Sequence, residues 1–192
     1  LRSASVDPYG LPCAITLLTG RSMMNFVKTL GLVSVVTLTI VGTARAEPHI
    51  EMSIPLEWAL EAATVASDVC LDMGFATTVT VVDQRAQPRV QLMREGAFPH
   101  TVSTSSRKAI TAASRRVATA VIEAENEHEP TLGAVFNEIG LITLSGGVPI
   151  LYEGEVIGGI GIAGSPGEDD SGKEFDDICA EAGIAAIADH LD

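Results

Sequence analysis

Two pairs of β-prone segments constrain the fold of this chain more than any other feature. In the first pair, residues 76–82 (ATTVTVV) are rich in β-branched side chains, and polar and apolar residues alternate over residues 89–93. In the second pair, two apolar runs at 141–151 and 155–163 flank Gly154, which suits a tight turn. Short connections join strands as antiparallel neighbours, so both pairs predict β-hairpins of an antiparallel sheet.

Helical periodicity surrounds these hairpins. It predicts three longer helices and one short helical segment, over residues 54–73, 103–120, 175–191 and 130–140. The second of these helices has an unusually small apolar face, which suits close packing against a sheet, a helix or a planar ligand. The acidic run at 123–129 (EAENEHE) is expected to be a solvated surface. The element order therefore predicts an α+β fold in which helices pack on an antiparallel sheet.

The N-terminal segment has the pattern of a secretory signal peptide. Within residues 23–46, Lys28 lies in a basic start, an apolar run covers 30–42, and Ala-Arg-Ala follows. The alternative is a transmembrane helix, but the apolar run falls short of the roughly 20 residues needed to span a bilayer. Residues 1–22 do not begin with Met and show no structural period, so they are expected to be an upstream or unstructured leader. A mature domain of residues 47–192 in the periplasm or outside the cell follows from this interpretation.

The charge of residues 47–192 excludes several classes of partner. This part of the chain holds 24 of the 25 acidic residues but only 8 of the 12 basic ones, a net charge of about −16. Nucleic acid is therefore excluded as a partner, because its binding depends on Lys and Arg that neutralise phosphates. No polybasic amphipathic stretch is present either, so no membrane binding is expected once the signal is cleaved.

The cysteines leave two possibilities open. Cys13 lies in the leader, which leaves Cys70 and Cys179 in the first and last predicted helices. After export these two thiols could form a disulfide. Alternatively they could be two small buried side chains on apolar helix faces.

Two glycine-containing segments resemble nucleotide-binding motifs but do not fit them. GIGIAG at 159–164 matches GxGxxG, yet it lies in a predicted strand rather than opening a helix, so it indicates a strand that something approaches closely. GEDDSGKE at 167–174 nearly matches a phosphate-binding loop, but Glu174 replaces the required hydroxyl and the acidic residues would repel phosphate. The EF-hand spacing is absent, so this segment is expected to be a solvated loop.

Candidate ligands are few. None of the four histidines has a second one at metal-ligand spacing, and no GxSxG elbow suggests a hydrolase. His100, in the loop before the second long helix, is the best candidate ligand. Arg107 and Lys108 lie near the start of that helix, where cations oppose the helix dipole and need anionic company. Either a ligand carboxylate or a neighbouring Asp could provide it.

Five segments in order resemble the GlcG/HbpS family. They are VTVVD, RKAITA, SGGVPI, GGIGIAG and FDDICAEAGIAAI, and the match extends over nearly all of residues 54–192. The chain is also similar to the C-terminal domain of PduO-type proteins. The resemblance implies a profilin-like fold with a five-stranded antiparallel sheet, assembly into homo-oligomers, and haem binding in several members.

By position, the resemblance also implies a ligand pocket. Its residues would be Lys108, Gly146, Gly147, Gly161, Gly164 and Asp176. An axial donor, an apolar slot and cations for the propionates are what haem requires, and His100, the small-faced helix and Arg107 with Lys108 could supply them.

The functional hypothesis is an exported, non-enzymatic haem-binding or haem-sensing protein, with His100 as the iron ligand. The alternative is a small-molecule-binding protein, or an enzyme of a catabolic pathway, that uses the same pocket without haem. A third possibility is a domain whose role is oligomeric assembly.

Overall fold

The computed structural model describes residues 50–191, so the predicted leader and signal peptide lie outside the described residues. The described residues belong to one compact unit. The helices and strands run in the order α1 (Leu56–Asp72), β1 (Thr78–Asp83), β2 (Pro88–Met93), α2 (His100–Arg115), α3 (Thr119–His128), α4 (Thr131–Glu138), β3 (Gly147–Tyr152), β4 (Glu155–Ala163) and α5 (Phe175–Ala186), followed by a short 3-10 turn at Ala188–His190. No helix among these residues is long and apolar enough to cross a membrane.

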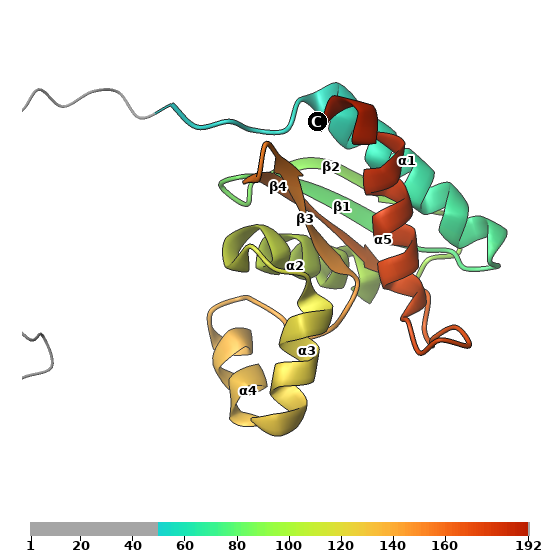
Figure 1. Cartoon of the computed structure of the whole chain (residues 1–192). Coiled ribbons are helices and arrows are strands. Elements are labelled where there is room, and N and C mark those ends of the chain that lie inside the picture. The colour runs from blue at the N-terminus through green and yellow to red at the C-terminus, as the bar shows by residue number, and fades with distance from the viewer. Residues whose placement is uncertain (1–49, 192) are drawn as a thin grey trace, which may run out of the picture. The chain divides into compact units, whose positions relative to one another are not determined.

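The strands form one antiparallel sheet in the order β2-β1-β4-β3. Both predicted hairpins, β1 with β2 and β3 with β4, are confirmed. The central pairing of β1 with β4 joins them and runs from Thr78 opposite Ala163 to Asp83 opposite Gly158. Helices α1 and α5 lie together on one side of this sheet, and α2 lies on the other (Figure 1).

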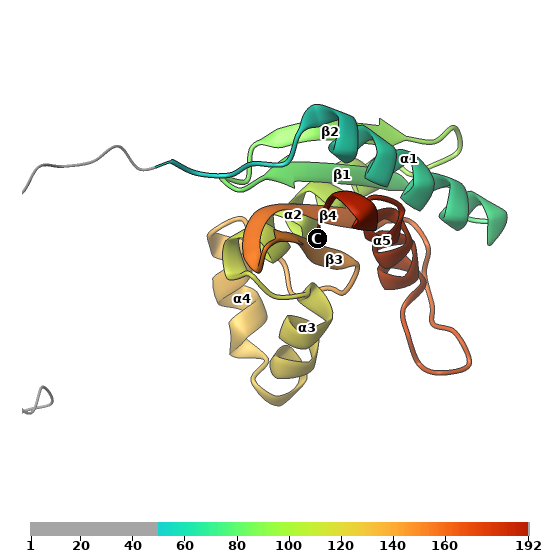
Figure 2. The same cartoon turned by 45° about the horizontal axis from the view of Figure 1, so that its top comes forward.

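The two faces of the sheet have different chemistry because side chains alternate along each strand. Val79 and Val81 of β1, with Ile160 of β4, belong to the main hydrophobic core, which α1 and α5 cover. Thr78 and Thr80 point to the opposite face, where their hydroxyl groups pair with hydroxyls of α2, Thr101 at 2.6 Å and Ser105 at 2.8 Å. The turned view in Figure 2 shows α1 and α5 again adjacent.

Glycines on β4 allow α2 to pack directly against the strand backbone. A Cβ at Gly159 would lie 2.6 Å from the carbonyl oxygen of Ala109, and one at Gly161 would collide with the backbone of Ser105 and Ala109. The interpretation of GIGIAG as a closely approached strand is therefore confirmed, and the small-faced helix α2 is what approaches it. Gly147 of β3, opposite Gly161, is equally close to the backbone of Lys108.

The second long helix differs from its prediction at both ends. It begins at His100 rather than at residue 103, because the hydroxyls of Ser103 and Thr104 donate to the carbonyl oxygen of His100 instead of capping the helix. It ends at Arg115, because Arg116 takes a left-handed conformation with φ of 59°. The acidic run predicted as solvated surface is part of the separate helix α3, in which Ile122 is buried.

The fifth strand implied by the family resemblance is absent from residues 50–191. The predicted strand 141–151 begins only at Gly147. Before that point, side chains of helices take the backbone hydrogen-bonding groups: Ile142 N–H donates to Thr111 Oγ1 at 3.0 Å, and Ser145 N–H donates to Glu123 Oε2 at 2.9 Å. A segment whose backbone groups are already satisfied by side chains does not add to the sheet.

Of the two possibilities left open for the cysteines, the structure contains the disulfide. Cys70 of α1 and Cys179 of α5 are bonded, their Cα atoms lie 5.6 Å apart, and both residues are fully buried in the main core. The bond connects the two helices that cover the same face of the sheet.

Candidate functional site

A pocket of about 420 Å³ lies where the start of α2 meets the end of β4 and the start of α5. Its volume is within the range of about 300–1,000 Å³ typical of small-molecule sites. Four of the residues proposed from sequence line it: His100, Lys108, Gly164 and Asp176. Its walls are largely apolar and come from Phe98, Leu144, Ala163 and Pro166.

A buried ion pair forms part of the pocket lining. Lys108 Nζ of α2 donates to Asp176 Oδ2 of α5 at 2.6 Å, and both residues are more than nine-tenths buried. The pair connects helices on opposite faces of the sheet. The sequence left open whether Lys108 pairs with a ligand carboxylate or with a neighbouring Asp. In the structure its partner is Asp176.

The other oxygen of Asp176 is hydrogen-bonded to Ser165, which lies beside the disulfide. Asp176 Oδ1 accepts from the backbone N–H of Ser165 at 3.1 Å and also from the Ser165 hydroxyl. That hydroxyl lies 3.5 Å from the sulfur of Cys70. Ser165 was not predicted as a site residue, although its place just after GIAG at a strand end was the one available signal.

His100 is at the rim of the pocket. It is the first residue of α2, its side chain is exposed, and its ring stacks on Phe98 with 5.9 Å between ring centroids. An imidazole in this position can coordinate a metal or donate to a ligand while the Phe98 ring provides an apolar surface.

Arg107 lies outside this pocket. Its guanidinium group donates to Asn137 Oδ1 at 2.6 Å and to the carbonyl oxygens of Gly140 and Leu141. It thus connects α2 to α4 and to the segment that follows α4. This geometry does not favour the predicted contact between Arg107 and a propionate.

The remaining proposed glycines have structural positions next to the pocket rather than in its lining. Gly146 has φ of +98°, and a Cβ there would lie 2.6 Å from the Cβ of Asp176 and 3.0 Å from Lys108 Nζ. Gly146, Gly147 and Gly161 therefore allow the ion pair and α2 to come close to the strands. The family resemblance placed these three glycines in the pocket, whereas in the structure they are not among its lining residues.

Asp177 binds the backbone of Gly146, just before β3 and next to the ion pair. Its Oδ1 accepts from the N–H of Gly146 at 2.7 Å. Burial raises the pKa of the Asp177 carboxyl, and this effect outweighs the opposing effects of the Gly146 hydrogen bond and the Lys108 charge.

We expect Asp177→Asn to make the folded protein more stable at pH 7, because Asn keeps the acceptor oxygen for Gly146 and removes a buried charge. A carboxyl whose pKa is raised by folding binds protons more tightly in the native state. The stability that its buried charge costs the fold is therefore regained as the pH falls. The difference between variant and wild type should therefore shrink below pH 7 and vanish below the ordinary Asp pKa of about 3.9. Urea unfolding of both proteins across this pH range measures the difference in their free energies of unfolding. Lower stability of Asp177→Asn at pH 7 would contradict the argument, and exposed Glu61→Gln is the control.

The chain shares its sequence pattern with a known family. The family described as haem degrading protein HbpS-like matches residues 54–185. This chain belongs to the HbpS-like family. The match covers all the elements that form the pocket and confirms the resemblance identified from the five sequence segments.

Solved structures agree with this assignment. A double mutant of HbpS from Streptomyces reticuli is 31% identical, with a TM-score of 0.65, and the alignment covers 75% of this chain and 94% of that one. The ORFY protein of Klebsiella pneumoniae is 21% identical with a TM-score of 0.65, covering 75% and 97% of the two chains. A PduOC:heme complex is 22% identical with a TM-score of 0.62, covering 71% and 96%. No curated protein matches this chain significantly.

The ORFY protein and the PduOC complex share the fold of this chain at low sequence identity, so these two matches support the fold alone. Export, oligomeric assembly and the absence of enzymatic activity stay predictions.

Proposed function

We propose that this HbpS-like protein binds haem in the pocket at the start of α2. The observation that carries the proposal is the meeting of an exposed imidazole, His100, with an apolar wall and a buried charge pair in one cavity. These are the features that a haem site requires, an axial donor beside an apolar slot. The description of the family refers to haem, and the similar PduOC structure is a haem complex, which supports the proposal.

Six of the residues that line the pocket have roles in this proposal. His100 would hold the iron, and Phe98, Leu144 and Pro166 would provide the apolar surface for the macrocycle. Lys108 and Asp176 neutralise each other and keep the inner end of the pocket rigid. When bound, haem would supply a redox-active iron. Because Arg107 is occupied by backbone carbonyls, we do not assign it to the propionates.

We further propose that the protein acts outside the cytoplasm. The Cys70–Cys179 disulfide supports this, since such bonds persist in oxidising compartments and are rare in the cytosol. The signal-like pattern of residues 23–46 points the same way.

A second candidate function is haem degradation, which the family description favours. The two functions differ in the fate of the bound haem. A binding or sensing protein keeps its Soret band after addition of a reductant and oxygen, whereas a degrading enzyme loses the band with release of iron.

We expect haemin to give a saturable Soret shift with the 47–192 unit, and His100→Ala to abolish the shift or weaken binding at least about tenfold, about 1.4 kcal/mol. The reason is loss of the axial donor, while the apolar wall remains. Absorbance titration with a competing albumin measures both. His128→Ala is the matched control, because His128 is exposed on α3 and outside the pocket. An unchanged shift in His100→Ala would move the iron ligand to another residue, and no saturable shift in the wild type would reject haem binding.

A further inference from the structure

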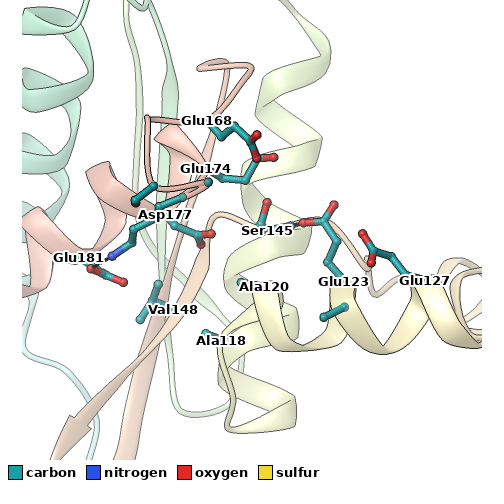
Figure 3. Close-up of a pocket in the computed structure, with 14 residues that line it drawn as sticks. Ala118, Ala120, Glu123, Glu127, Ser145, Val148, Glu168, Glu174, Asp177 and Glu181 are labelled. Atoms are coloured by element: carbon teal, nitrogen blue, oxygen red, sulfur yellow. Dashed lines mark hydrogen bonds and ion pairs between the residues drawn. The ribbon is translucent and has the colours of Figure 1, made fainter.

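A second cleft, of about 490 Å³, lies between α3, the loop before α5 and the first turns of α5. It shares no lining residue with the proposed haem pocket. Six carboxylates line it: Glu123, Glu127, Glu168, Glu174, Asp177 and Glu181. Figure 3 shows several of them around the common space, with Ser145 between Asp177 and Glu123.

Positive charge in the cleft does not balance these carboxylates. Lys173 is the one cationic side chain among the described lining residues, and its ammonium pairs with Glu181. Glu123 accepts one hydrogen bond, from the backbone N–H of Ser145 at 2.9 Å. The pKa of Glu174 is raised, first by burial and then by the charges of neighbouring carboxylates that include Glu123 and Glu168. The cleft therefore holds a strong negative potential.

Two oxygen atoms at the base of the cleft have unused hydrogen-bonding capacity. Ser145 is only 6% exposed, and no group among residues 50–191 hydrogen-bonds to its hydroxyl. Asp177 is also 6% exposed, and within the described part of the chain its Oδ2 accepts no hydrogen bond, since Gly146 contacts Oδ1. Both residues line the cleft, so the free lone pairs of the hydroxyl and of the carboxylate oxygen are open to donors of a ligand that enters it.

The chemistry of the cleft selects the class of ligand. A primary ammonium group carries three N–H donors and one positive charge, which suits Asp177 Oδ2, Ser145 Oγ and a neighbouring carboxylate together. A metal ion suits the cleft less well, because no three His, Cys, Asp or Glu side chains of the described residues converge in a way that could hold one. The outer carboxylates on α3 and the loop are available for further positive charges along the same ligand.

We propose that this cleft binds a small organic cation with two or more ammonium groups, such as a linear diamine or polyamine. One ammonium binds Ser145 Oγ and Asp177 Oδ2 at the base, and the remaining ammonium groups face the outer carboxylates, including Glu127 and Glu168. This site is independent of the proposed haem pocket.

The test is calorimetric titration of the 47–192 unit with spermidine and with putrescine at constant ionic strength. We expect saturable binding that weakens at least about tenfold in Asp177→Asn and in Ser145→Ala, because each removes an acceptor at the base. Asp177→Asn is expected to remain folded, and circular dichroism confirms this for both variants. Glu61→Gln removes one exposed negative charge on α1, outside the cleft, and is the matched control.

Several results would overturn the proposal. They are heat signals that NaCl of equal ionic strength reproduces, equal weakening in Glu61→Gln, unchanged binding in both cleft variants, and binding of Ca²⁺ but not of amines at the same residues. His100→Ala should bind spermidine as the wild type does, so failure of the haem proposal leaves this test intact. Loss of amine binding in His100→Ala would show that the two sites are one.

Discussion

Replacing Asp176 with Ala is expected to destabilise the folded protein by about 3–5 kcal/mol, because the Lys108 ammonium then stays buried without its counter-charge. The change also removes the acceptor of the Ser165 hydroxyl and backbone N–H. Urea unfolding of the 47–192 unit at neutral pH measures the effect. The midpoint should fall sharply while the slope of the transition stays the same.

The control for this prediction is removal of both charges. In Lys108→Met with Asp176→Leu, no charge is left unpaired, so most of the lost stability should return. A single Asp176→Ala that unfolds at the wild-type urea concentration would show that the ion pair is solvated in solution. A double variant as unstable as the single one would show that the charge is not the cause of the loss.

Loss of the Cys70–Cys179 disulfide is expected to destabilise the protein by about 2–5 kcal/mol. The bond joins residues 109 positions apart, so its removal frees a long loop in the unfolded chain. For a domain of this size the melting temperature should fall by on the order of 10 °C. Thermal unfolding of the wild type with and without a reductant, compared with Cys70→Ala/Cys179→Ala, measures this.

The double cysteine variant separates the bond from other effects of the reductant. Residues 47–192 contain no other cysteine, so the variant should melt at one temperature whether or not the reductant is present. Two free thiols in the oxidised wild-type protein, or equal melting temperatures in both conditions, would contradict the disulfide. Its loss should also affect the proposed haem pocket, because Ser165 lies beside Cys70 and hydrogen-bonds to Asp176.

The main features of the fold could be predicted from local sequence. Alternation of polar and apolar residues and short connections gave both hairpins, and helical periodicity gave α1, α4 and α5, because these patterns reflect local geometry. The ends of α2 could not be predicted in this way. Whether Ser103 caps a helix or bonds back to His100 depends on how Pro99 and Phe98 enter the helix, and on what α2 packs against.

The candidate site was predictable only in part. The residue pattern and the resemblance to the HbpS-like family together named eight site residues, His100 and Arg107 included, and four of them line one pocket. Their side-chain partners did not follow from sequence, because the ion pair of Lys108 with Asp176 joins residues 68 positions apart from opposite faces of the sheet. The acidic loop was predicted as solvated, and the cleft that it forms with α3 was not foreseen.

The sequence by itself determined the order of the hairpins and of the helices other than α3, the antiparallel pairing within each hairpin and the family of this protein, because all three are recorded in local patterns. Only the tertiary structure decided that Cys70 and Cys179 are bonded, that Gly159 and Gly161 of β4 face α2, and that Arg107 turns away from the pocket. Those outcomes depend on distances between residues far apart in the chain. Such distances are fixed when the helices pack on the sheet, and no local pattern contains them.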